Sequence, residues 1–250
     1  MPPRYEVIGV EGIPEIRPGD DVARLVVDAA HAQGTPILPR DLLVVGQKVV
    51  SKSEGRLVRL TDVTPSPVTL ALAPALGRDP RFVEVVLRES RRIVRMDKTV
   101  LITETHHGWV CANAGVDQSN VDADTVALLP EDPDASARRL RESIRTLTGA
   151  DVAIIVADTF GRPWREGLTN VAIGAAGFAA QRSYLGDLDP AGRPLQATVL
   201  AVADELASAA ELVMGKLARI PVGIVRGFDW APSEDGSKPL LRDPARDLFR

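Results

Sequence analysis

A run of apolar residues at positions 151–157 constrains the fold of this chain more than any other segment. Four of these seven residues are Val or Ile, and two more are Ala. A strand that is buried on both faces has this appearance, because neither face needs polar side chains. The run therefore predicts a buried central strand. Asp158 and Thr159 follow it directly, so a carboxylate and a hydroxyl are expected at the carboxyl end of that strand.

Strand and helix patterns elsewhere follow no regular order. Short β-rich runs predict strands at residues 7–10, 41–50, 100–103, 109–111 and 221–225. Helical spacing and composition predict helices at residues 21–33, 81–91, 134–147 and 195–217, the last with an alternative strand at 197–202. Asp20 or Asp21 is expected to cap the first helix. This mixture favours an α+β fold with mixed sheets over a doubly wound sheet.

Two further segments bear on the organisation of the chain. The proline-rich residues 65–74 predict a connection, and the small residues at 174–180 predict close packing. Since no long flexible linker interrupts the sequence, residues 1–250 are expected to form a single unit with two lobes.

Composition narrows the class of protein. The 250 residues carry a formal net charge of −4, whereas a general nucleic-acid binder needs a clear basic excess. Cys111 is the only cysteine, which excludes an intrachain disulfide and a cysteine zinc cluster. No apolar run approaches the roughly 20 residues that span a bilayer, and the amino terminus lacks a signal-peptide layout. A cytoplasmic protein without a membrane partner is expected.

Two segments depart from the pattern of a hydrophobic core. Residues 111–120 combine small residues with Asp117 and Asn120, as a loop does where backbone and ligand approach closely. The second segment contains Asp158 and Thr159. Oxygen ligands suit Mg²⁺ and Mn²⁺. The alternatives are equally open: Asp117 as a solvated loop residue, Asp158 as a helix cap and Asn120 as a turn residue.

Basic residues suggest where anionic groups could bind. Gln47, Lys48 and Lys52 follow a predicted strand and could hold phosphates, although lysines in such positions are more often solvated. The sequence has no Walker A motif. Arg162 and Arg165 could bind carboxylate or phosphate, or they could pack over the intervening Trp164.

Other reactive residue types have simpler interpretations. His106 and His107 are expected in a hairpin turn, and they form no convincing metal set with the remaining histidine. Cys111 is interpreted as a small buried residue. No serine lies in a nucleophile-elbow pattern, so any chemistry is expected to be metal-assisted.

Several motifs in order along the chain resemble those of the F420:γ-glutamyl ligase family. They are residues 11–15, 18–21, 47–56, 107–117 with 119–121, 158–165 and 202–210. The resemblance extends over about residues 5–228. It implies a family-specific α+β fold and a homodimer with its site near the subunit interface. It also implies GTP-dependent addition of L-glutamate to the F420 precursor that lacks glutamate, followed by a second, γ-linked glutamate.

The resemblance also implies roles for individual residues. Asp117 and Asp158 would hold a divalent metal, Mg²⁺ or Mn²⁺, and Thr159 would serve a second; K⁺ stays open as a further cofactor. The residues that would contact GTP are Gly12, Ile13, Pro14, Glu15, Gln47, Lys48, Lys52, Asn120, Met214, Gly215 and Lys216. The family often has a neutral or acidic polar group where Lys216 stands. A lysine there could neutralise phosphate but could not ligate a metal ion. The flavin reductase-like domain that some relatives carry is not expected.

The expected chemistry proceeds through an acyl phosphate. Transfer of the γ-phosphoryl group of GTP would activate the acceptor carboxylate, and the amine of glutamate would then displace phosphate. Arg162 or Arg165 is expected to hold one of the two acidic substrates. The rival interpretations are a nucleotide-dependent amide ligase for another acceptor acid and a non-catalytic nucleotide-binding module.

Overall fold

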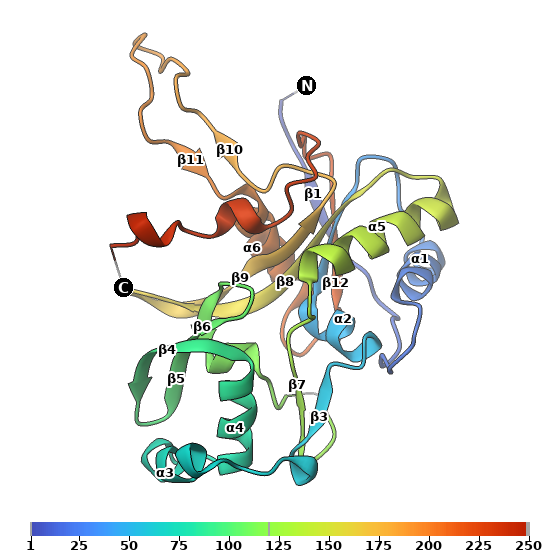
Figure 1. Cartoon of the computed structure of the whole chain (residues 1–250). Coiled ribbons are helices and arrows are strands. Elements are labelled where there is room, and N and C mark those ends of the chain that lie inside the picture. The colour runs from blue at the N-terminus through green and yellow to red at the C-terminus, as the bar shows by residue number, and fades with distance from the viewer. Residues whose placement is uncertain (1, 120, 249–250) are drawn as a thin grey trace.

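A five-stranded sheet organises the molecule in the computed structural model, which describes residues 2–119 and 121–248 (Figure 1). Its strands are, in spatial order, β1 (Glu6–Gly9), β12 (Val222–Arg226), β2 (Leu42–Gly46), β8 (Ala153–Arg162) and β9 (Arg165–Ala176). β2 and β8 are parallel, and the other neighbours are antiparallel. The sheet is therefore mixed, as the sequence predicts.

Both faces of this sheet are covered by helices, because its central strands are apolar on both sides. Leu43 and Val45 of β2 pack in the cluster that contains α1 (Val22–Ala32) and α5 (Pro133–Thr148). Leu42 and Val44 point the other way, toward α6 (Val202–Met214). Alternate residues of a strand face opposite sides, so a continuous apolar run is what this sandwich of helices requires.

A second group of elements forms its own hydrophobic cluster. The cluster includes residues of α3 (Pro67–Leu76), α4 (Pro80–Arg88) and β5 (Val100–Thr105), and β4 (Ser90–Asp97) and β6 (Val110–Ala112) flank β5 in its sheet. β4, β5 and β6 are antiparallel neighbours, and Figure 1 shows them with α3 and α4 beneath the main sheet. The expectation of one unit with two lobes stays a prediction.

Short elements complete the described chain. They are α2 (Gln47–Ser53), the pair β3 (Leu57–Arg59) and β7 (Thr125–Ala127), the pair β10 (Arg182–Ser183) and β11 (Val199–Leu200), and 3-10 turns at Leu60–Asp62, Asn113–Gly115, Lys238–Leu240 and Pro244–Arg246. No helix in the described part of the chain has both the length and the apolar character needed to cross a bilayer.

The α+β class is confirmed, and so is the buried strand, since every residue of 152–157 is buried. Asp21 caps α1, its carboxylate accepting a hydrogen bond from the amide of Arg24 at 3.0 Å. Close packing is confirmed at Gly174. A Cβ atom built there would lie 2.5 Å from the carbonyl carbon of Pro133, in the first turn of α5.

Three predictions of local structure are wrong. The expected connection at 65–74 is largely helix α3, since Ser66 caps it and Pro67 occupies its first turn, where proline is tolerated. The strand at 41–50 ends at Gly46, and the chain continues as α2. The helix expected from residue 195 begins only at Val202, because the preceding residues include β11. Prolines and β-branched residues therefore do not exclude a helix in α3 and α2, and helix-favouring composition does not ensure one before Val202.

Candidate active site

Asp158 and Thr159 lie within β8, not after it as the sequence suggests. The parallel neighbour β2 ends at Gly46, opposite Ala157, while β8 continues beside β9 to Arg162. Successive strand residues point to opposite faces. Asp158 therefore faces α2, and Thr159 faces α6.

Asp117 reaches this position from the other group of elements. Its backbone exchanges hydrogen bonds of 3.0 and 2.8 Å with Ala127. Its carboxylate forms an ion pair with Lys48 of α2, with 2.7 Å between Nζ and Oδ2. It also accepts hydrogen bonds from the amide and hydroxyl of Ser119, at 2.7 and 3.0 Å. Asp117 is thus held in one orientation by groups on both sides.

The two carboxylates differ in electrostatic surroundings. Burial raises the pKa of Asp158 to about 6; the negative charge of Asp117 adds to this rise, and the positive charges of Lys216 and Lys48 oppose it. Burial also acts to raise the pKa of Asp117, but its hydrogen bonds with Lys48 and Ser119 outweigh this and hold the pKa below its usual value. Each carboxylate therefore feels the charge of the other, although they come from separate parts of the chain.

This pair fits a hard divalent cation. No group of three or more His, Cys, Asp or Glu side chains that could hold a metal occurs in residues 2–119 and 121–248. Two carboxylates are nevertheless the usual protein share of a Mg²⁺ site, in which water and substrate phosphates supply the remaining oxygens. A cation between Asp117 and Asp158 would also relieve the repulsion by Asp117 that adds to the rise in the pKa of Asp158.

Thr159 belongs to a polar network on the opposite face of β8. Its hydroxyl donates to Oδ1 of Asn170 at 2.7 Å, and the Asn170 amide donates to Oε2 of Glu211 at 2.8 Å. The ammonium group of Lys216 contacts the Thr159 hydroxyl oxygen and lies 3.6 Å from Oε1 of Glu211. Asn170 and Glu211 are not among the residues that the sequence suggests. An Asn inside the apolar run of β9 is the signal in the sequence that points to Asn170.

The nucleotide-site candidates of α2 are well ordered by their neighbours. Gln47 is buried, and its side-chain oxygen accepts from the hydroxyl of Ser51 at 2.8 Å. Lys52 is 8% exposed and forms an ion pair with Glu15, which belongs to the predicted 12–15 contact segment. The more common interpretation of Lys52, as a solvated lysine, is therefore wrong. Gly12 begins that segment with a φ of 77°, which favours glycine.

The structure places the other candidate residues at the tip of the β8–β9 hairpin and at the end of α6. Arg162 and Arg165 pair with each other at the tip of the β8–β9 hairpin. Arg162 is roughly 13 Å along the strand from Asp158, at about 3.3 Å per residue, and donates to the carbonyl of Glu166 at 2.6 Å. Met214 is buried in the core beneath Gly223, and Gly215 ends α6. Asn120 lies outside the described residues.

The remaining reactive residue types have structural roles. His106 and His107 lie in the turn between β5 and β6, as expected, and bond to the backbone carbonyls of Arg88 at 2.8 Å and Pro130 at 2.9 Å. Burial raises the pKa of the Cys111 thiol to about 12. A thiol held protonated in this way is a poor nucleophile.

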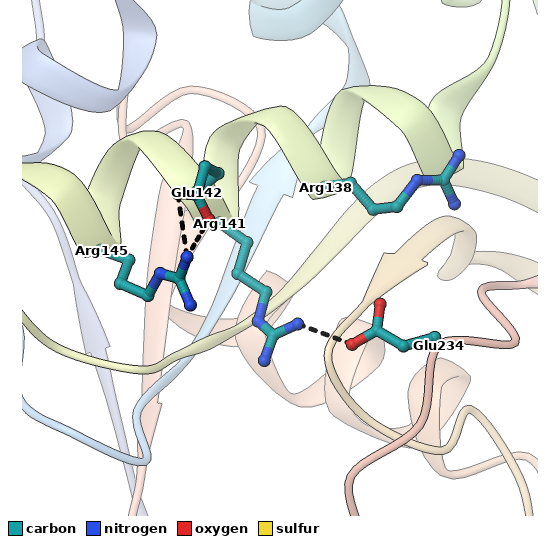
Figure 2. Close-up of a pocket in the computed structure, with 5 residues that line it drawn as sticks. All are labelled: Arg138, Arg141, Glu142, Arg145 and Glu234. Atoms are coloured by element: carbon teal, nitrogen blue, oxygen red, sulfur yellow. Dashed lines mark hydrogen bonds and ion pairs between the residues drawn. The ribbon is translucent and has the colours of Figure 1, made fainter.

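The arginine-lined cavity along α5 is not the site (Figure 2). Its volume is about 240 Å³, and it is lined by Arg138, Arg141, Glu142, Arg145 and Glu234. Carboxylates neutralise its cations: Arg141 pairs with Glu234 at 2.8 Å, and Arg145 pairs with Glu142 at the same distance. None of the site residues suggested by the sequence lines it.

Comparison with known proteins identifies the family to which the chain belongs. The model of the F420-0:gamma-glutamyl ligase family matches residues 12–227. The coenzyme F420:L-glutamate ligase of Methanothermobacter thermautotrophicus is 44% identical over 247 residues, which cover 98% of each chain. The enzyme of the same name from Methanopyrus kandleri is 45% identical over 249 residues, 96% of this chain and 97% of the relative. The one from Methanocaldococcus jannaschii is 39% identical over 248 residues, 99% and 97%. With nearly complete coverage in each comparison, the chain belongs to the F420-0:gamma-glutamyl ligase family and is a ligase.

Proposed function

We propose that this enzyme uses GTP to join L-glutamate to the F420 precursor that lacks glutamate, and then adds a second, γ-linked glutamate. The observation that carries the proposal is that Lys48 pairs with Asp117 at 2.7 Å and that the charges of both act on Asp158, although the three residues come from distant parts of the chain. Support for the substrates comes from the relatives, which are named coenzyme F420:L-glutamate ligases.

The reaction proceeds through an activated carboxylate. The acceptor carboxylate attacks the γ-phosphorus of GTP, GDP leaves, and an acyl phosphate forms. The amine of glutamate then attacks the acyl carbon, an amide bond forms, and inorganic phosphate leaves. A Mg²⁺ or Mn²⁺ ion held by Asp117 and Asp158 would supply positive charge for the phosphate oxygens when bound.

The chain itself supplies positioning and charge. Lys48 and Lys52 lie four residues apart on α2, so both ammonium groups project from a similar side of one short helix. We place the GTP phosphates along this helix, with Gln47, Asn120 and the 12–15 segment as further contacts. The buried Lys52 is fixed by Glu15 before any nucleotide arrives, and a pre-positioned charge loses less entropy on binding.

The direct test is a product assay with the F420 precursor, L-glutamate, GTP and either Mg²⁺ or Mn²⁺. Mass spectrometry is expected to show products heavier by one and then two glutamyl units. Omitting GTP or the divalent metal should abolish both products, and ATP in place of GTP should give much less. GTP and metal binding without any glutamylated product would instead assign the chain to another acceptor acid or to a non-catalytic module.

We also propose a cytoplasmic homodimer. The β8–β9 hairpin tip presents two apolar side chains, Trp164 and Leu168, which are 85% and 68% exposed, and an exposed group of apolar side chains, unlike a single one, is typical of a protein contact. The double substitution Trp164→Ser and Leu168→Ser is expected to lower the mass in light scattering from a dimer to one chain of 26.8 kDa. Leu212→Ser, at an 88% exposed leucine on α6, is the matched control and should leave the dimer intact. A doubly substituted chain that stays dimeric would remove the hairpin from the interface.

A further inference from the structure

A cation already lies beside the hydroxyl oxygen of Thr159. The ammonium group of Lys216, which follows the end of α6, contacts this oxygen and approaches Oε1 of Glu211 at 3.6 Å. The family resemblance gives the same oxygen to a second divalent metal. The Lys216 ammonium and a second divalent metal ion would therefore compete for the same position beside Thr159.

The hydrogen bonds around Thr159 show whether its hydroxyl group directs its proton or its oxygen lone pairs toward Lys216. An ionised Glu211 carboxylate can only accept, so the Asn170 group that faces it at 2.8 Å is the NH₂ end. The oxygen end of the Asn170 amide consequently faces Thr159 and accepts its proton at 2.7 Å. With the proton committed to Asn170, the lone pairs of the Thr159 oxygen are directed to Lys216 and are available only to a donor or a cation.

We propose that the Lys216 ammonium takes the place of a second divalent cation. Each active site then holds a single divalent ion, bound between Asp117 and Asp158. An ammonium has three donors and no lone pair, so it cannot become a metal ligand. It also repels a divalent ion that approaches the same oxygen. A second divalent ion therefore does not fit the residues around Thr159.

The ammonium can perform the electrostatic task of such an ion. Directed at the nucleotide, it would offer phosphate oxygens one positive charge and the donors that Thr159 does not use. This inference rests on the proposed function, because it assigns charges within the same nucleotide site.

In the rival arrangement, Lys216 leaves Thr159 and a second metal ion binds in its place. The Lys216 side chain is 61% exposed, so it has room to swing outward. Thr159 and Glu211 would then offer oxygens to a second metal ion. Counting bound ions separates the two arrangements without measuring turnover.

The experiment counts Mn²⁺ ions on the full-length protein by electron paramagnetic resonance of free Mn²⁺. It uses a saturating, non-hydrolysable GTP analogue, and the analogue alone gives the background. The wild-type chain is expected to bind one ion. Lys216→Glu removes the ammonium and supplies an oxygen ligand, and it is expected to bind two. Lys238→Glu, at an exposed lysine in a 3-10 turn near the carboxyl terminus, makes the same charge change away from the site and should bind one.

Two ions in the wild-type chain would overturn the inference and leave the proposed function intact. A folded Lys216→Glu chain that still binds one ion would overturn it as well, because Lys216 would not be what excludes the second. No ion in the wild-type chain would contradict the proposed metal-dependent function itself. If the Glu variant does not fold, Lys216→Gln replaces it, with two ions again expected.

Discussion

Replacing Asp158 with Asn is expected to lower kcat/KM by at least about 100-fold. Asn keeps an oxygen at the same place but removes the negative charge that attracts a divalent ion. Even groups that only orient a metal ligand typically contribute 10–100-fold, so a direct ligand should contribute more. The measurement is steady-state kinetics of glutamylated product formation at saturating Mn²⁺.

The same substitution should leave folding intact. Burial disfavours the charged form of Asp158, so an uncharged amide is expected to give an equal or higher Tm in the absence of divalent metal. Asp28→Asn, the same change at an exposed residue of α1, is the control and should alter neither kcat/KM nor Tm. Wild-type kinetics in the Asp158 variant would remove this carboxylate from the metal site.

The second large effect concerns stability and is expected from Gly174→Ala. The added Cβ atom would lie 2.5 Å from both the carbonyl carbon and the oxygen of Pro133. These are backbone atoms of α5, which cannot rotate away as a side chain could. Either the helix or β9 must shift, at about 3 kcal/mol of unfolding free energy. The corresponding loss of Tm is roughly 6–12 °C for a chain of this size, measurable by differential scanning calorimetry.

A matched glycine on the same hairpin serves as the control. Around Gly161 of β8, the nearest heavy atom to an added Cβ is Cδ2 of Leu168, at 4.0 Å. Gly161→Ala is therefore expected to leave Tm nearly unchanged. Equal losses in the two variants would mean that the intrinsic properties of alanine, and not the contact with Pro133, cause the effect.

The sequence predicts best where local composition determines structure. The apolar run ending at Ala157 identifies a buried strand, because few other environments tolerate such a run. The Asp117 and Asp158 motifs are recognisable as site candidates for a related reason: acidic residues beside small residues and apolar strands need a specific explanation. The structure brings these two carboxylates close enough for each to feel the charge of the other.

Prediction fails where structure depends on residues far apart in sequence. Asn170 is placed opposite Thr159 by the antiparallel register of β8 and β9, and no spacing rule reveals that pairing in advance. Residues close in sequence can also lie far apart in space, as Arg162 shows. It lies four positions from Asp158 in sequence, but an extended strand carries it to the hairpin tip, whereas a compact loop would have kept it close. The helix that begins at Pro67 is hard to predict because it carries a second proline, Pro74, in its interior, where proline usually breaks a helix.

Strand β2 ends opposite Ala157, and this point divides β8 into two parts with different surroundings. Up to that residue the strand is enclosed by neighbours on both sides and by helices on both faces, and its side chains only stabilise the fold. Beyond it, the strand has one neighbour, β9, and it carries the candidate metal ligands Asp158 and Thr159. Substitutions before Asp158 are therefore expected to act mainly on stability. At Asp158 itself, the charge proposed to bind metal is held at a cost in folding free energy, so adjacent residues of one strand serve opposing demands.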